Sequence, residues 1–156
     1  MLPLNRAAAV VLLAALLCGG CVPGPRRRAE RPALPASSAA LEAGARETLE
    51  ALAAAYQAND IERFVERVDD HLFPDFISFR ERLRDSLRDD RQINLDIVVD
   101  TVSPGTGEVS ITAHWNEGWV GKDGRHRSDK GRCELMFRLQ PSGAMALAAI
   151  RGDSPF

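Results

Sequence analysis

The hydrophobic positions after residue 40 follow two different periods along the chain. In the first half, apolar residues recur at intervals of three and four, as they do on one face of a helix. The first stripe consists of Leu41, Ala45, Leu49, Leu52 and Tyr56. The later stripes consist of Ile61, Phe64, Val65, Val68 and Leu72, and of Phe76, Phe79, Leu83 and Leu87. The pattern predicts three successive helices.

Capping and breaking residues predict where these helices begin and end. Ser37 or Ser38 can cap the first helix with its hydroxyl oxygen. Asn59-Asp60 breaks that helix and starts the second, because Glu62 follows Asn59 by three residues as in a capping box. Pro74 cannot continue a helix, so it ends the second and opens the third.

After Arg91 the period changes to two, which is typical of strands. Apolar positions alternate with polar ones at Ile93, Leu95, Ile97 and Val99, at Val109, Ile111, Ala113 and Trp115, and at Cys133, Leu135, Phe137 and Leu139. Glycine- and proline-rich turns separate these runs at 103–107, 121–124 and 141–143, and a last strand follows from Ala144 to Ile150. Consecutive strands joined by tight turns form an antiparallel meander. The sequence therefore predicts an α+β domain in which three N-terminal helices cover one face of the sheet.

The alternation also predicts which side chains are buried. Cys133 and Phe137 fall on the apolar side of their strand and are expected in the core. Asp96 and Asp100 fall on the opposite side, and so does His114. We expect these three side chains to face outward.

The N-terminal segment has the pattern of an export signal. Arg6 precedes an apolar run from Ala7 to Leu17, and small residues follow. A run of about eleven residues is too short for a membrane-spanning helix, which needs roughly 20. We expect residues 1–20 to be a cleaved signal peptide.

The stretch Leu16-Leu17-Cys18-Gly19-Gly20-Cys21 resembles the lipobox of bacterial lipoproteins, in which small residues precede a cysteine that receives lipid. The resemblance implies that Cys21 carries diacylglycerol and a further acyl chain such as palmitate, giving a stable membrane anchor. Val22 follows it, which in the lipoproteins resembled favours the outer membrane facing the periplasm. Cys18 is the competing acceptor, and an ordinary secretory signal is the alternative interpretation.

Composition then divides the mature chain into two parts. Residues 21–40 are rich in Pro, Arg, Ala and Ser and nearly lack bulky apolar residues, so we expect the lipidated cysteine to lead into a disordered linker. The basic cluster of this linker either contacts anionic headgroups or only keeps the linker soluble. Residues 41–156 are the expected folded domain. From Pro32 onward the chain carries 15 basic and 21 acidic residues, a net charge of −6, which argues against nucleic acid as a partner.

The remaining composition limits the chemistry. With Cys18 and Cys21 assigned to the signal region, Cys133 has no partner for a disulfide. The three histidines have no metal-ligand spacing, and no phosphate-binding loop or nucleophile elbow is present. We predict no metal site and no cofactor.

Two local segments support a more specific fold. Leu52–Phe64 looks like the first-helix segment of the nuclear transport factor 2-like (NTF2-like) superfamily, in which an aromatic residue precedes a break and a second helix. Ala146–Phe156 is similar to the last strand and tail of its exported bacterial members. The resemblance implies a cone-shaped α+β fold whose curved sheet and helices enclose a pocket, used for catalysis in ketosteroid isomerases and polyketide cyclases.

Four residues are candidates for binding a ligand or partner: Tyr56, Trp115, Trp119 and His114. Core packing is the alternative role of Tyr56, Trp115 and Trp119. No acid–base pair can be assembled in the cavity from the pattern, so no catalytic residue is predicted. We expect a lipid-anchored, non-catalytic domain that binds a small apolar ligand or a cell-envelope protein, with a homodimer as another possible partner arrangement. The alternative is a small cofactor-independent isomerase or cyclase of the ketosteroid-isomerase type.

Overall fold

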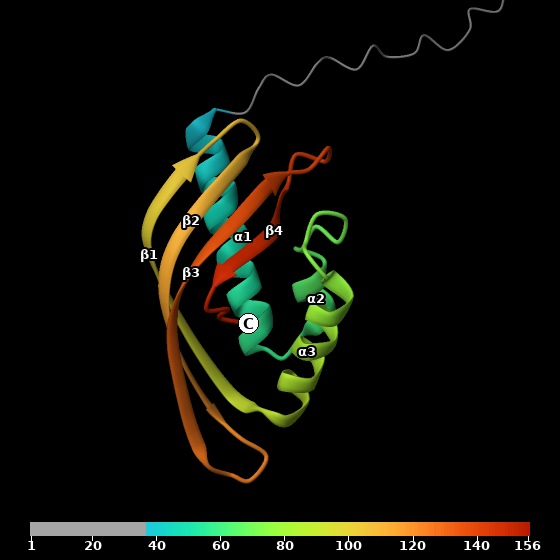
Figure 1. Ribbon diagram of the computed structural model, residues 1–156, viewed down its shortest axis with the longest axis vertical. Helices are drawn as coiled ribbons and strands as arrows, with labels where there is room; N and C mark the ends of the chain where they lie inside the picture. Colours follow the sequence, from blue (N-terminus) through green and yellow to red (C-terminus); the bar gives the residue numbers. More distant parts are fainter. Residues whose placement is uncertain (1–36) are drawn as a thin grey trace, which may run out of the picture. The chain divides into compact units, whose positions relative to one another are not determined.

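The computed structural model describes residues 37–156, which form three helices followed by four strands (Figure 1). The helices are α1 (Ser38–Gln57), α2 (Ile61–Val65) and α3 (Phe76–Asp89). The strands are β1 (Arg91–Pro104), β2 (Glu108–Val120), β3 (His126–Leu139) and β4 (Met145–Gly152). The predicted α+β order is confirmed. The signal segment, Cys21 and the linker up to residue 36 lie outside the described residues.

The first helix begins and packs as its apolar stripe predicts. The Ser37 hydroxyl accepts a hydrogen bond from the Ala40 backbone N–H at 3.2 Å and so caps α1. All five residues of the predicted stripe are buried. Thr48 is also buried, and its hydroxyl contacts two carbonyl oxygens, of Gly44 at 2.8 Å and of Met145 at 3.2 Å. This polar group therefore ties α1 to the start of β4 without remaining unsatisfied.

The second helix differs from the prediction in both its length and its cap. It ends at Val65, and Val68 instead forms a parallel bridge with Leu147 of β4. Leu72 is 43% exposed, although the helical stripe placed it in the core. The bridge explains the difference, because backbone pairing with β4 satisfies this segment in an extended conformation.

The cap of α2 is Asp60, whose carboxylate accepts from the Arg63 N–H at 3.0 Å, so the predicted capping box from Asn59 is wrong. Asn59 has φ = 58° and uses its side chain to donate to the Leu87 carbonyl oxygen at 2.6 Å. Asn59 still interrupts the helix between α1 and α2, as predicted. It does so through a left-handed backbone conformation that asparagine tolerates.

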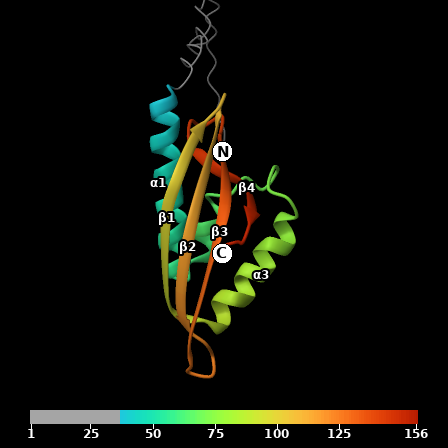
Figure 2. The same ribbon diagram turned by 60° about the vertical axis from the view of Figure 1, so that its left-hand side comes forward.

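The strands form one antiparallel sheet in the order β1-β2-β3-β4. β1, β2 and β3 are long and curved, and α1 runs beside β1 (Figure 2). Register shifts interrupt the β1–β2 ladder between Arg91 and Asn94 and between Val99 and Thr101, and a further shift at Ala148 of β4 interrupts the β3–β4 ladder. Such bulges bend a strand locally. The meander topology is the predicted one.

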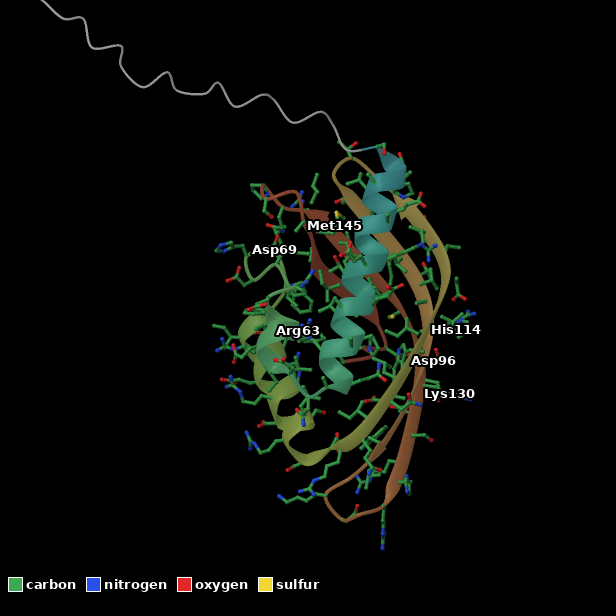
Figure 3. All side chains as sticks on the ribbon, turned by 180° about the vertical axis from the view of Figure 1, so that it is seen from behind. Arg63, Asp69, Asp96, His114, Lys130 and Met145 are labelled. Carbon is green, nitrogen blue, oxygen red and sulfur yellow. The ribbon has the colours of Figure 1, made fainter. Side chains whose placement is uncertain are left out.

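The core lies between the helices and the apolar face of the sheet. Cys133 and Phe137 are buried, as the alternation predicted, and His114 and Asp96 point outward on the other face (Figure 3). Within residues 37–156, no helix is both long enough and apolar enough to cross a membrane.

The segment after β4 turns back along the apolar side of the sheet. Gly152 makes this turn with φ = 84°, and a Cβ there would lie 2.7 Å from the Arg132 carbonyl oxygen. Only glycine fits such a position without strain. The indole N–H of Trp115 then donates to the Asp153 carbonyl oxygen at 3.0 Å and fixes the direction of the segment. Residues 153–156 therefore become part of the covered side of the sheet.

Candidate functional site

A pocket of about 400 Å³ lies between α3, the loop before it and the end of β4. We call it the α3 pocket. Its lining is mostly apolar and is made of Phe73, Pro74, Phe79, Arg82, Leu83, Ser86, Ile150, Gly152, Ser154 and Phe156. Binding sites for small molecules are commonly concave and apolar with a few polar groups, and this volume lies within their usual range.

The helical periodicity of α3 explains how the pocket is built. Phe79 and Leu83 are four residues apart and buried, so they form its floor on the helix side. Arg82 and Ser86 are also four residues apart but exposed, so they stand together at the rim. Within residues 37–156, Arg82 makes no ion pair. The rim thus presents a positive charge and a hydroxyl beside an apolar interior.

The opposite wall is formed by the segment after β4. The ring of Phe156 packs edge-on against Phe64, with 4.9 Å between the ring centroids, and against Tyr56, with 5.5 Å between them. These are favourable aromatic geometries. The Ser154 hydroxyl donates to the Phe156 carbonyl oxygen at 2.8 Å, which holds the turn of the segment. Phe156 therefore separates Tyr56 from the α3 pocket.

The four residues singled out from the sequence do not form one site, although His114 and Trp115 both line an open pocket on β2 and β3. Tyr56 and Trp115 are buried in the core, with 4% and 5% of their surface exposed, and neither lines the α3 pocket. Trp119 is half-buried on the extended part of β2. His114 lies on the outer face of the sheet, where its Nδ1 is 2.8 Å from a carboxylate oxygen of Asp100. Tyr56 and Trp115 thus contribute to the packing of the core.

Tyr56 nevertheless has a polar partner that sequence analysis missed. Its hydroxyl donates to the carboxylate of Glu117 at 2.8 Å. Glu117 has the same strand parity as Trp115 and Trp119, and this parity was the available signal that it faces the covered side. A glutamate among tryptophans on that side needs a hydrogen-bond donor, and Tyr56 supplies it.

The surroundings alter the acidity of both groups. Burial raises the pKa of the Glu117 carboxyl above its ordinary value, the hydrogen bond from Tyr56 opposes the rise, and the charges of Asp90 and Asp129 add to it. Burial, together with the hydrogen bond and charge of Glu117, raises the pKa of the Tyr56 phenol far above its ordinary range. Tyr56 therefore remains a donor throughout the range in which the fold is stable.

The raised pKa of Glu117 predicts a specific pH dependence. The folded protein holds this proton at pH values where the unfolded chain has released it, so the free energy of unfolding falls as pH rises above about 4.5 through the folded pKa. Glu117→Gln keeps an acceptor for Tyr56 but has no proton to lose. We expect the variant to be as stable as the parent at acidic pH and more stable near neutrality, as measured by urea unfolding from pH 4 to 8. A constant difference between the two proteins over that range would contradict the prediction.

The other potential metal ligands and nucleophiles of the described domain do not form a site. No cluster of three or more His, Cys, Asp and Glu side chains in residues 37–156 could hold a metal ion. Burial raises the pKa of the Cys133 thiol to about 11, and the negative charge of Asp153 adds to this effect. The thiol is therefore protonated at neutral pH and unsuited to nucleophilic chemistry.

Comparison with known proteins identifies the fold. No protein-family model and no curated protein matches the sequence. Among solved structures, the chain is similar to an NTF2-like superfamily protein from Salmonella enterica serovar Typhimurium, with 10% identity, a TM-score of 0.64, and coverage of 77% of this chain and 94% of that one. A ketosteroid isomerase-like protein from Erwinia carotovora atroseptica has 12% identity and a TM-score of 0.60, over 73% and 97% of the two chains.

A protein of the NTF2-like family from Streptomyces avermitilis has 14% identity and a TM-score of 0.62, over 70% of this chain and 93% of that one. Identities this low show the fold alone. The domain has an NTF2-like fold, as the two local segments of the sequence implied. Because this fold carries both enzymes and binding proteins, the function has to be argued from the site.

Proposed function

We propose that this chain is a lipid-anchored cell-envelope protein whose NTF2-like domain binds a small apolar ligand with an anionic group in the α3 pocket, without catalysis. The single observation that carries the ligand-binding part is the lining of that pocket. Apolar rings from α3, from the loop before it and from residue 156 enclose the interior, while Arg82 stands at the rim.

The charge at the rim supports an anionic group on the ligand. Arg82 has no ion-pair partner within the described domain, so its guanidinium is available for a carboxylate or sulfonate. Ser86, one helical turn away on the same side, can donate a further hydrogen bond. An amphipathic ligand would place its apolar part against Phe79 and Leu83 and its anionic group toward Arg82.

The same lining supports a non-catalytic role. Among the described residues that line the pocket, Arg82 has the only titratable side chain, and an arginine does not give up its proton near neutral pH. Proton transfer to or from a bound molecule needs a group that does so, such as a carboxylate or histidine. Glu117 and Tyr56 hydrogen-bond to each other and do not line the pocket.

Binding can be tested with the fluorescent sulfonate 8-anilinonaphthalene-1-sulfonate and with dodecanoate as its competitor. Ser86 is exposed at the rim, so Ser86→Trp fills the pocket entrance without disturbing the core. We expect this variant to lose binding by at least about tenfold, which corresponds to about 1.4 kcal/mol. Arg84→Ala is the matched control, since Arg84 is exposed on the same helix and does not line the pocket.

The role of Arg82 can be measured by comparing the binding of an anionic and a neutral ligand. Arg82→Ala should weaken binding of dodecanoate and leave binding of the neutral dodecanol unchanged, because only the carboxylate uses the guanidinium. Equal binding of the sulfonate by the parent and by Ser86→Trp would refute the α3 pocket as the site.

One observation favours a second candidate function, an isomerase or cyclase that removes a proton from a carbon atom of its substrate and forms an enolate. The carboxylate of Glu117 has a raised pKa beside a phenolic donor, as a general base and its enolate-stabilising partner require. Catalysed exchange of the α-protons of cyclohexanone in D₂O, lost in Glu117→Gln, would support this function over the binding role. Exchange at the uncatalysed rate in the parent would count against it.

The anchor part of the proposal rests on the lipobox-like sequence around Cys21. Outer-membrane attachment facing the periplasm would hold the domain at the membrane surface through the N-terminal lipid, where amphipathic ligands and cell-envelope proteins are available. Cys21→Ser removes the thiol that would carry this lipid and so tests the anchor.

A further inference from the structure

The two edges of the sheet differ in how they are covered. At β4, the backbone of residues 67–69 pairs with Leu147: the Leu147 N–H donates to the Arg67 carbonyl oxygen, and the Asp69 N–H donates to the Leu147 carbonyl oxygen, both at 2.9 Å. At β1, no segment of residues 37–156 pairs with the outer edge. An exposed strand edge is a template for pairing with another chain.

The direction of the free backbone groups follows from one contact. The Leu95 N–H donates to the Gln57 side-chain oxygen at 3.3 Å, away from β2, so Leu95 directs its backbone groups toward the outer edge. Residues two apart along a strand direct these groups to the same side. Ile97 and Val99 therefore direct their backbone N–H and C=O groups toward the open edge. Asp96 and Val98 direct theirs toward β2.

An apolar groove runs along this open edge between β1 and α1. It has a volume of about 450 Å³ and is lined by Arg46, Leu49, Glu50, Ala53, Ile97, Val98 and Val99. Val98 is 44% exposed, which is unusual for a valine in the middle of a strand. Figure 2 shows α1 and β1 lying side by side. We call this surface the β1-edge groove.

Two opposite charges border the groove one helical turn apart. Arg46 and Glu50 are both exposed on α1, and neither forms an ion pair with another residue of the described domain. A second α1 running antiparallel beside this one would place its glutamate against Arg46 and its arginine against Glu50. The pattern of charges is therefore complementary to itself under a two-fold rotation.

We propose that the β1-edge groove pairs with a second copy of this chain through antiparallel contact of the two β1 strands, centred on Val98. In this register, Ile97 exchanges backbone hydrogen bonds with the partner subunit's Val99, and Val98 faces the partner subunit's Val98. The two α1 helices lie on the same side of the joined sheets, with Arg46 against the partner subunit's Glu50. A second copy fits this surface better than an unrelated extended peptide, because it alone supplies both the matching edge and the matching pair of charges.

The register makes a disulfide test possible in the full chain in its native membranes. Val98 and the partner subunit's Val98 form a pair without hydrogen bonds between them, whose Cα atoms lie about 4.5 Å apart in antiparallel sheets, within reach of a disulfide. Val98→Cys should give a crosslinked dimer on a non-reducing gel after mild oxidation. Asp96→Cys is the matched control on the same strand and face. Its two copies would lie about four residues apart along the strands, too far to crosslink.

The parent chain controls for its own cysteines, because any dimer formed through them appears there too. A crosslinked band in Val98→Cys that is absent from the parent and from Asp96→Cys supports the proposed register. No crosslink in Val98→Cys, or equal crosslinking of the Asp96→Cys control, overturns it.

A charge exchange tests the helix contact independently. In the Val98→Cys background, Arg46→Glu or Glu50→Arg alone brings like charges together and should lower the crosslinking yield. The double change restores opposite charges across the interface and should restore the yield. A double variant that crosslinks as poorly as both single variants would contradict the antiparallel α1 contact.

Discussion

Replacing Phe137 by alanine is expected to lower the free energy of unfolding by about 3–5 kcal/mol, the usual range for removal of a buried phenylalanine ring. Phe137 is 1% exposed and lies near the C-terminal end of β3, opposite Val109 of β2 and Leu147 of β4. Removing the ring leaves a cavity in the core that the surrounding side chains fill only in part. For a domain of this size the melting temperature should fall by roughly 10–20 °C.

The matched control is Arg138→Ala, one residue further along the same strand and exposed on the opposite face. Its free energy of unfolding should stay within about 0.5 kcal/mol of the parent value. Chemical denaturation of both variants measures the difference directly. A small effect of Phe137→Ala together with a large effect of Arg138→Ala would mean that the buried and exposed faces of β3 are the reverse of those described.

Cys21→Ser is expected to move essentially all of the protein from the membrane fraction to the soluble envelope fraction. The physical reason is that a serine cannot form the thioether that carries diacylglycerol, and two or more acyl chains are what make such an anchor stable. Cell fractionation followed by immunoblotting measures the distribution. The domain should keep its melting temperature, because Cys21 lies outside residues 37–156.

The competing acceptor supplies the control for this experiment. Cys18→Ser should leave the protein in the membrane fraction, since Cys18 belongs to the segment expected to be removed. Release caused by Cys18→Ser and not by Cys21→Ser would show that the lipid is on the other thiol. Membrane attachment of a double variant, Cys18→Ser with Cys21→Ser, would refute a lipid anchor at either cysteine.

The sheet could be predicted from the sequence almost completely, because its signals are local. Alternation is strict over residues 109–115 of β2 and 133–138 of β3, so the burial of Cys133 and Phe137 and the outward position of His114 followed from parity. Glycine-rich turns marked the ends of the strands. The helical stripe of α1 and its Ser37 cap were local in the same sense.

The second helix could not be predicted in the same way, because a distant partner determines its end. Val68 and Leu72 continue the helical period of Phe64, yet residues 67–69 pair with Leu147, about 80 residues later in the chain. Tertiary pairing overrides a local pattern when it satisfies the backbone equally well.

The candidate site is less predictable still, because its walls come from separate parts of the chain. The α3 pocket requires residues 153–156 to turn back under the sheet, and this turn depends on the positive φ of Gly152 and on the contact between Trp115 and Asp153. Glu117 was overlooked because a charged residue on the apolar side contradicts the pattern that parity arguments use. Its partner, Tyr56, lies 61 residues earlier in the chain.

Amide chemical-shift mapping can show directly whether the α3 pocket is the binding site of this domain. In the Cys21→Ser chain, titration with dodecanoate should shift the amide signals of Leu83, Ser86, Ile150 and Gly152, which line the pocket. The signals of Ala53 and Ile97 in the β1-edge groove should stay unchanged. Shifts confined to the β1-edge groove, or no shifts at millimolar dodecanoate, would show that the α3 pocket is not the binding site.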